Sequence, residues 1–209
     1  MTLPDTGVSS RRQQRRAVET RAALLRTATE MFSASGFDSI SIRQLEEMAG
    51  VKRGLAAYHF GDKDHLWMAA VDQLFAVLIE DFVSRVTGLA DVAPEEAARG
   101  FIKAFVRYSA HFPQLNRLMM QECMSDSWRV AYIVDNHVRP MLDDLTALMP
   151  EAAKLLWGSR DAHRYYLYVG ASAFVFSAEQ ECLRLFGVSP RTEDFIEQHA
   201  NLVAKILLQ

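Results

Sequence analysis

A short stretch of the chain carries side chains that could bind a nucleic acid. Lys52 and Arg53 follow a glycine turn, and Tyr58 and His59 come within the next two helical turns. The small residues between them, Gly54 included, would let this stretch approach another surface closely. A short helix led by cations is typical of a recognition helix in the major groove of DNA. An ordinary helical hairpin with solvated charges is the alternative that this stretch alone leaves open.

The residues before these cations have the signals of a short helix followed by a turn. Ser41 and Gln44 form the Ser-x-x-Gln pattern of a capping box, so a helix should begin at Ile42. This helix should end at about Ala49, because Gly50 tolerates the positive φ that commonly follows a helix. Two short helices joined at a glycine turn form a helix-turn-helix.

Further cations flank the helix-turn-helix. Asp62 is a suitable N-cap for a long helix whose first turn carries Lys63, a cation placed to contact a DNA phosphate. Residues 1–67 have a net charge of +2, whereas residues 68–209 have a net charge of −5. The positive end therefore suits a polyanion. Its upstream cations are Arg11, Arg12, Arg15, Arg16, Arg21 and Arg26.

Motif positions within residues 20–67 match a known DNA-binding domain; they are Arg43, Ala49-Gly50-Val51, Gly54, Tyr58-His59-Phe60, Lys63 and Leu66. This segment resembles the N-terminal domain of the TetR/AcrR family of bacterial transcription regulators. The resemblance implies that residues 54–59 form the recognition helix and that Tyr58, His59 and Lys63 contact DNA phosphates. It also implies a homodimer whose C-terminal helices bind a small effector that weakens DNA binding.

This chain departs from the family pattern within the recognition helix. Lys52 stands where Ser or Thr is usual, and Leu55, Ala56 and Ala57 stand where Thr, Leu and Tyr are frequent. Base contacts therefore cannot be transferred from the family, although Arg43, Lys52 and Arg53 are able to reach base edges. The predicted DNA-binding residues are Arg43, Lys52, Arg53, Gly54, Leu55, Tyr58, His59 and Lys63.

The chain as a whole has helical periodicity and no strand pattern, so we expect an all-α fold. Its 209 residues, half of them hydrophobic, suffice for two domains. We expect a DNA-binding domain over residues 1–66 and an effector-binding and dimerisation domain over residues 67–209. The predicted helices span about 16–35, 42–49, 63–86, 95–112, 114–123, 128–148 with a kink at Pro140, 161–186 and 192–208.

Several classes of protein find no support in the sequence. Cys123 and Cys182 are too few for a disulfide framework, and no signal peptide precedes the arginines, so we expect a cytoplasmic protein. The longest uncharged run, residues 165–178, is too short for a membrane span. His111 and His137 lack a second ligand at helical spacing, so we expect no metal site. No catalytic residue and no cofactor are predicted.

The last two predicted helices carry apolar stripes that suit a four-helix dimer interface. One short recognition helix reads little sequence, and operators are normally bound as two half-sites, which favours a homodimer. The alternative is that both stripes face the chain's own core. The predicted interface residues are Ser172, Val175, Leu183, Phe195, Leu202, Val203 and Ile206.

Aromatic and methionine residues concentrate after residue 66, a composition that suits an adaptable apolar ligand cavity. A packed core is the alternative, and for any single aromatic residue it is the better-supported interpretation. Glu122 shares a helix face with Leu115 and Leu118, and a buried carboxylate there needs a partner: Arg, Tyr, water or a ligand. The predicted ligand-binding residues are Trp67, Phe75, Phe105, Tyr108, Met119, Glu122, Trp128 and Tyr168.

Three classes of function remain open. The first is a repressor that binds an inverted-repeat DNA operator and is released by a small, largely apolar effector. The second is an effector-independent DNA-binding protein or an activator. The third and weakest is an enzyme in which residues such as Glu122 and His111 meet only in three dimensions, because no nucleophile and base occur at a recognisable spacing.

Overall fold

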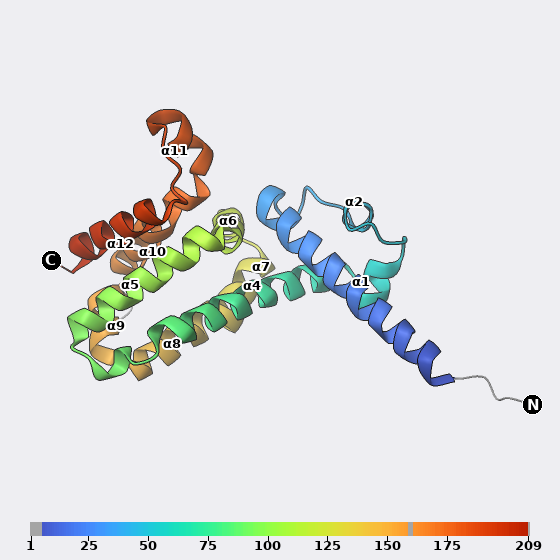
Figure 1. Cartoon of the computed structure of the whole chain (residues 1–209), viewed down its shortest axis with the longest axis horizontal. Helices are drawn as coiled ribbons and strands as arrows, with labels where there is room; N and C mark the ends of the chain where they lie inside the picture. The colour runs from blue at the N-terminus through green and yellow to red at the C-terminus, as the bar shows by residue number, and fades with distance from the viewer. Residues whose placement is uncertain (1–5, 159–160, 209) are drawn as a thin grey trace, which may run out of the picture. The chain divides into compact units, whose positions relative to one another are not determined.

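The computed structural model describes residues 6–158 and 161–208, and over these ranges the regular elements are all helical (Figure 1). The predicted all-α fold is confirmed. The α-helices are α1 (Thr6–Ser35), α2 (Ile42–Met48), α3 (Leu55–Phe60), α4 (Lys63–Val86), α5 (Pro94–His111), α6 (Pro113–Glu122), α7 (Trp128–Ile133), α8 (Arg139–Leu148), α9 (Pro150–Trp157), α10 (Ala162–Ser177), α11 (Glu179–Phe186) and α12 (Glu193–Leu207). A 3₁₀ turn, η1 (Leu89–Asp91), and a π turn, η2 (Val134–Val138), complete them.

The chain divides into two compact units, of which the first ends at Leu74 and the second begins at Phe75. This division lies inside α4, whereas the sequence placed the boundary near the start of that helix, between residues 66 and 67. Over the described residues, no helix combines the length and the hydrophobicity that crossing a bilayer requires.

The N-terminal unit is built around α1. Leu24, Ala28 and Phe32 lie one helical turn apart on this helix and are fully buried or nearly so. The same face contacts α2 and α3. α1 begins at Thr6 rather than near residue 16 as predicted, because residues 8–15 contain neither glycine nor proline to stop it. It ends at Gly36, whose φ is 78°.

In the second unit, α5 packs against α9, α10 and α12, as Figure 1 shows. Nine residues of α5 are buried, and among them Ile102 and Val106 lose all contact with solvent. Ion pairs tie the rim of this helix to α12. Lys103 Nζ lies 3.0 Å from Glu197 Oε1, and Arg107 Nη2 lies 2.8 Å from Glu197 Oε2.

The structure differs from the prediction between residues 128 and 157. The single kinked helix expected there is interrupted by the π turn η2, directly before α8. Pro140 explains this interruption, because proline lacks the N–H that an α-helix needs and its ring crowds the preceding turn. The sequence also missed α9, which begins with Pro150 and ends at Gly158, where φ is 61°.

The helix predicted over residues 161–186 is also two helices. α10 ends at Ser177, and Ala178 has φ −96° and ψ 28°, outside the helical region. Arg191, which follows α11, contacts the first residue of that helix, because its Nε donates to Glu179 Oε2 at 2.7 Å. The same guanidinium donates from Nη1 to the carbonyl of Ala110 at 3.1 Å. No local pattern in the sequence predicts such a break.

Candidate nucleic-acid interface and interior cavities

The first helix of the predicted helix-turn-helix is capped as the sequence indicates. The backbone N–H of Ser41 donates to Gln44 Oε1 at 2.8 Å, and the backbone N–H of Gln44 donates to Ser41 Oγ at 3.3 Å. These reciprocal bonds make a complete capping box, so α2 begins at Ile42. The turn that follows uses Gly50 with a φ of 67°.

α3 receives its N-terminal cap from α2, because its own cap residue, Gly54, has no side chain to supply one. The buried carboxylate of Glu46 accepts a hydrogen bond from the backbone N–H of Ala56 at 2.9 Å. This bond fixes the orientation of α3 relative to α2. Glu46 was not among the predicted site residues. Its signal is an acidic residue on the inner face of α2, before a helix whose own cap residue has no side chain.

Replacing Glu46 with leucine should loosen α3, because the buried N–H of Ala56 would lose its acceptor. We expect local opening of α3 to become easier by about 1–3 kcal/mol, or roughly 5- to 150-fold faster amide exchange. Hydrogen exchange of α3 measured by mass spectrometry checks this. Glu47→Leu is the matched control, since Glu47 is exposed. Equal exchange of α3 in both variants would remove the positioning role from Glu46.

The cations predicted to read bases are exposed. Arg43, Lys52 and Arg53 all face solvent, and among the described residues none of the three has an ion-pair partner. Tyr58 is 78% exposed, and its ring stands edge-on to that of His59 at 5.0 Å between centroids. Gly54 is exposed, whereas Leu55 and His59 are half-buried. The predicted residues of α3 thus gather around one end and one side of this short helix.

Lys63 is held at the first turn of α4. Its Nζ lies 3.9 Å from the centroid of the Phe37 ring, a cation–π distance. Asp62 caps the helix as predicted, because its Oδ1 accepts the backbone N–H of His65 at 2.9 Å. This bond is the main reason that the pKa of Asp62 lies below its usual value. The side chain of Lys63 is half-buried.

The upstream arginines lie on the exposed start of α1. Arg11, Arg12, Arg15 and Arg16 line one shallow groove together with Glu19. Arg15 Nε is 2.8 Å from Glu19 Oε1, and this pair is well exposed. The positive charge predicted at this end of the chain is therefore carried on a helix.

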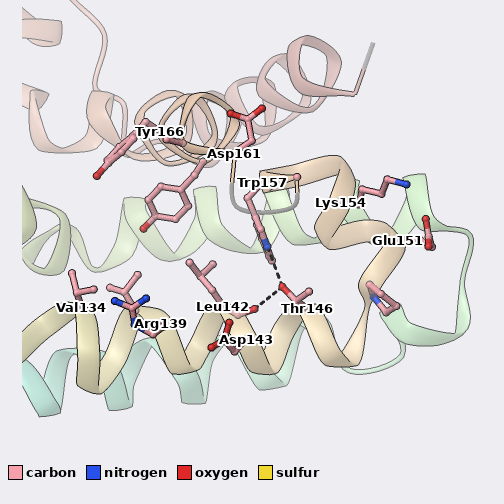
Figure 2. Close-up of a pocket in the computed structure, with 15 residues that line it drawn as sticks. Val134, Arg139, Leu142, Asp143, Thr146, Glu151, Lys154, Trp157, Asp161 and Tyr166 are labelled. Carbon is pink, nitrogen blue, oxygen red and sulfur yellow. Dashed lines mark hydrogen bonds between the residues drawn. The ribbon is translucent and has the colours of Figure 1, made fainter.

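A large pocket opens in the second unit between η2, α8, α9 and the start of α10 (Figure 2). Its volume is ≈ 700 Å³, and we call it the outer pocket. Arg139, Asp143 and Lys154 give its lining charged groups, while Trp157 and Tyr166 give it aromatic walls. Trp157 Nε1 donates to Thr146 Oγ1 at 3.2 Å, which links α9 to α8.

A smaller and more apolar cavity, the inner cavity, lies among α4, α5, α6, α8, α9 and α10 and has a volume of ≈ 90 Å³. Phe82 and Phe101 meet edge to face at 5.0 Å between ring centroids, and Phe105 stacks on Tyr168 at 5.2 Å. Asn116 Nδ2 and the Tyr168 hydroxyl are buried in this lining without a hydrogen-bond partner among the described residues. Burial raises the pKa of Tyr168 well above 10, so its hydroxyl stays protonated.

Four of the predicted ligand-binding residues line the inner cavity: Phe75, Phe105, Met119 and Tyr168. Tyr108 is fully buried beside Phe112 but belongs to neither lining. Trp128 is 40% exposed and lines neither cavity. Trp67 lies in the N-terminal unit, where its ring meets Phe37 edge-on at 6.4 Å. Trp67, Tyr108 and Trp128 therefore lie outside the linings of both cavities, and a ligand-binding role for them stays a prediction.

The partner of Glu122 is an arginine of its own chain. Arg129 Nε donates to Glu122 Oε2 at 2.6 Å, and both side chains are buried. Glu122 lines neither cavity, so the structure gives it a structural contact in place of a ligand contact. His111 contacts the Arg107 carbonyl at 2.8 Å and Glu193 at 3.7 Å. Among the described residues, the Glu122–His111 pairing that the enzyme hypothesis required is not formed.

Sequence reasoning missed several residues that line these cavities. Trp157 and Tyr165 line both the inner cavity and the outer pocket, and Asn116 and Phe101 line the inner one. Trp157 was not predicted to line a cavity because its helix, α9, was not predicted. The sequence signals of α9 were nonetheless present, since Pro150 and Gly158 mark the two ends of a short helix.

Two of the predicted interface residues are in the chain's own core. Ser172 is fully buried and Val203 is 2% exposed, so neither is available to a second copy. Val175 and Phe195 are half-buried, whereas Leu183, Leu202 and Ile206 are exposed. The exposed large hydrophobic residues of α10 are Tyr166, Leu167 and Phe174, none of which was predicted to lie at the interface.

His199 lies between the two helices that carry these surfaces. Its Nε2 is 2.9 Å from the carbonyl of Ala171, and its ring stacks on Phe195 at 5.9 Å between centroids. Burial is the main cause that lowers the pKa of His199 below 6.5, against a smaller opposing effect of the hydrogen bond to Ala171.

This lowered pKa predicts how stability depends on pH. Because the unfolded chain binds a proton to this histidine more readily than the folded chain does, the free energy of unfolding should fall as pH drops below about 6.5. Above that pH the contribution is constant. Urea denaturation at pH 7.5 and 5.5 checks this, with His199→Gln expected to reduce the difference. His163→Gln, at an exposed position, is the control; an identical effect of the two substitutions would refute the assignment.

The helix-turn-helix with its exposed cations defines a DNA-binding protein. Residues 24–70 match the family model described as "Bacterial regulatory proteins, tetR family". The transcriptional regulator RutR of Escherichia coli K12 is 22% identical over 189 residues, 90% of this chain and 88% of RutR. The transcriptional repressor AcnR of Corynebacterium glutamicum is 33% identical over 88 residues, 42% of this chain and 43% of AcnR. Residues 24–70 therefore form a domain of the kind found in TetR-family bacterial regulators.

The fold also agrees with that of solved members of the family. The structure of AibR, solved in complex with isovaleryl coenzyme A and operator DNA, superposes with a TM-score of 0.60. AibR is 18% identical, and the match covers 90% of this chain and 98% of AibR. At this level of identity the similarity concerns the fold.

Proposed function

We propose that this protein is a cytoplasmic repressor that binds an inverted-repeat operator as a homodimer and is released by a small, largely apolar effector. The observation that carries the proposal is the cluster of exposed cations formed by Arg43 of α2 and by Lys52 and Arg53 before α3, none of which has an ion-pair partner among the described residues. In a TetR-family helix-turn-helix, this cluster belongs in the major groove of DNA. The name of AcnR as a repressor supports the direction of regulation.

The cations divide into two roles by their positions. Arg43, Lys52 and Arg53 are free to reach base edges, where loss of a bidentate contact costs about 1–3 kcal/mol of discrimination. His59 and Lys63 are half-buried at the edge of the cluster, and we assign them to phosphates. Phosphate contacts position the protein without selecting a sequence.

Lys63→Ala should therefore weaken binding to operator and to random DNA by similar factors. The salt dependence of the binding constant should flatten by about 0.9 per lost phosphate contact, because fewer counterions are released. His59→Ala should also lower both affinities alike. Arg53→Ala is the contrasting variant and should reduce operator affinity more than random affinity. Fluorescence anisotropy over a range of salt concentrations measures both effects. A changed base preference with an unchanged salt slope for Lys63→Ala would contradict the phosphate role.

The homodimer proposal rests on the apolar surface that the second unit leaves exposed. Leu167 and Phe174 of α10 and Leu202 and Ile206 of α12 are each about half exposed. These two helices pack against each other, so their free faces can form one surface. A second copy that covered this surface would make a four-helix interface and supply the second recognition helix that an inverted repeat requires.

The effector proposal rests on the outer pocket and the inner cavity. The outer pocket, at ≈ 700 Å³, has the size of a small-molecule site, for which about 300–1,000 Å³ is usual. α4 connects such a site to DNA binding, because it begins with Lys63 and its later residues Phe75 and Phe82 line the inner cavity. The AibR complex, which contains both an acyl coenzyme A and operator DNA, supports a regulator with both kinds of partner.

A further inference from the structure

The inner cavity contains two buried hydrogen-bonding groups that none of the described residues satisfies. Asn116 is 8% exposed and Tyr168 is 4% exposed, and both line the cavity. Asn116 Nδ2 and the Tyr168 hydroxyl have no partner among the described residues. Buried polar groups in proteins are nearly always hydrogen-bonded, so two orphans in one apolar cavity indicate a missing partner.

The chemistry of the two groups specifies what that partner offers. The amide nitrogen of Asn116 only donates, and the neutral phenol of Tyr168 has a proton to donate. Both donors need an acceptor, and a carbonyl oxygen has two lone pairs, one for each of two donors. The rest of the lining is aromatic and aliphatic, with Phe82, Phe101 and Phe105 among its walls. The group attached to the carbonyl is therefore apolar.

The dimensions limit that group to a compact one. The inner cavity, at ≈ 90 Å³, is far smaller than the outer pocket of ≈ 700 Å³. The two share Val138, Leu142, Trp157 and Tyr165 as lining residues. Figure 2 shows Leu142 projecting from α8 and Trp157 projecting from α9 into the space between these two helices. A ligand can therefore have one end in the inner cavity and the remainder in the outer pocket.

We propose that the inner cavity binds the acyl end of a small molecule: a short apolar chain whose carbonyl oxygen accepts hydrogen bonds from Asn116 and Tyr168. The remainder of the molecule lies in the outer pocket, beside Arg139 and Lys154. The assignment of this molecule as the effector rests on the proposed function, whereas its binding to the second unit does not.

Two probes of nearly equal shape test the carbonyl contact. 4-Methyl-2-pentanone has a carbonyl oxygen where 2,4-dimethyl-1-pentene has a methylene group. Each is titrated into the full-length ¹⁵N-labelled protein, and the indole N–H signal of Trp157 reports binding. For each protein variant we take the ratio of the two dissociation constants. The two probes differ in hydrophobicity by the same amount in every variant, so a change in this ratio between variants reports the hydrogen bond to the carbonyl.

We expect Tyr168→Phe to reduce the relative preference for the ketone by on the order of ten-fold, because it removes one donor and keeps the ring against Phe105. Asn116→Leu should act in the same direction. Tyr166→Phe is the matched control, since Tyr166 is exposed and lines only the outer pocket; it should leave the ratio unchanged. If Asn116→Leu does not fold, Tyr168→Phe alone decides the test.

An unchanged ratio in Tyr168→Phe would overturn the proposal, and so would a Trp157 signal that responds to neither probe, since the cavity would then hold water only. Operator affinity measured with the same ketone separates this site from the proposed function. A ketone that binds through Tyr168 and leaves operator affinity unchanged would support the site and contradict its role as the effector site.

Discussion

Glu122→Leu should destabilise the second unit by about 3–5 kcal/mol, because it removes the carboxylate that lies 2.6 Å from the buried guanidinium of Arg129. The Glu122–Arg129 pair is buried on both sides, with 2.6 Å between Nε and Oε2. Urea denaturation followed by circular dichroism measures the loss. Asp135→Leu is the control, because the Asp135–Arg139 pair is exposed and such pairs contribute about 0–1 kcal/mol.

A double variant tests the cause of this loss. Glu122→Leu combined with Arg129→Met should recover most of the stability, since replacing both members of a buried ion pair by apolar residues is often neutral or stabilising. If Glu122→Leu alone lowered the free energy of unfolding by less than about 1 kcal/mol, the result would contradict a buried ion pair. It would return Glu122 to the ligand-binding role that the sequence suggested.

Leu202→Glu should produce monomers with little operator affinity. Residue 202 is 55% exposed in the single chain, so the substitution spares the core and acts only when a second copy covers the position. An unpaired carboxylate buried at the interface costs about 3–5 kcal/mol, or roughly 150- to 5,000-fold in the dissociation constant of the dimer. Analytical ultracentrifugation measures this constant, and Ile206→Glu should behave in the same way.

Two controls separate the interface from the core and from general effects of charge. Val203→Glu should unfold the second unit, because Val203 is buried within it. Val83→Glu introduces the same charge at a valine of α4 that is 59% exposed, and this variant should remain dimeric. If Leu202→Glu and Ile206→Glu both remained dimeric, the exposed face of α12 would not be the interface.

The helix-turn-helix was predictable because its signals are local. Ser41 and Gln44 cap α2 within one turn, and Gly50 sets the turn that follows. Asp62 then caps α4 through the backbone N–H of His65. These interactions span at most four residues, so the sequence displays them directly. The cap that Glu46 gives to Ala56 spans ten residues and two helices, and local pattern reading missed it.

The second unit was less predictable because distant contacts determine it. Beside the break at Ala178, for example, Arg191 reaches back to Glu179 from twelve residues further along the chain. The periodicity of the sequence identified the apolar residues of α12 but not which of them face the core of the chain and which face solvent. Leu202 and Val203 are adjacent in sequence, yet a helix turns about 100° between them, so one faces solvent and the other the core. Composition likewise indicated an aromatic cavity, whereas only the packing of α9 brings Trp157 to it.

Selection of bound sequences from random duplex DNA by the purified protein, followed by footprinting of the enriched sequence, tests the central claim most directly. A dimeric helix-turn-helix regulator predicts an inverted repeat whose half-sites are about 34 Å, or roughly 10 base pairs, apart or a multiple of that spacing. Both half-sites should be protected together, and Leu202→Glu should abolish protection of both. Enrichment of a single unpaired site, or of no sequence at all, would contradict the claim.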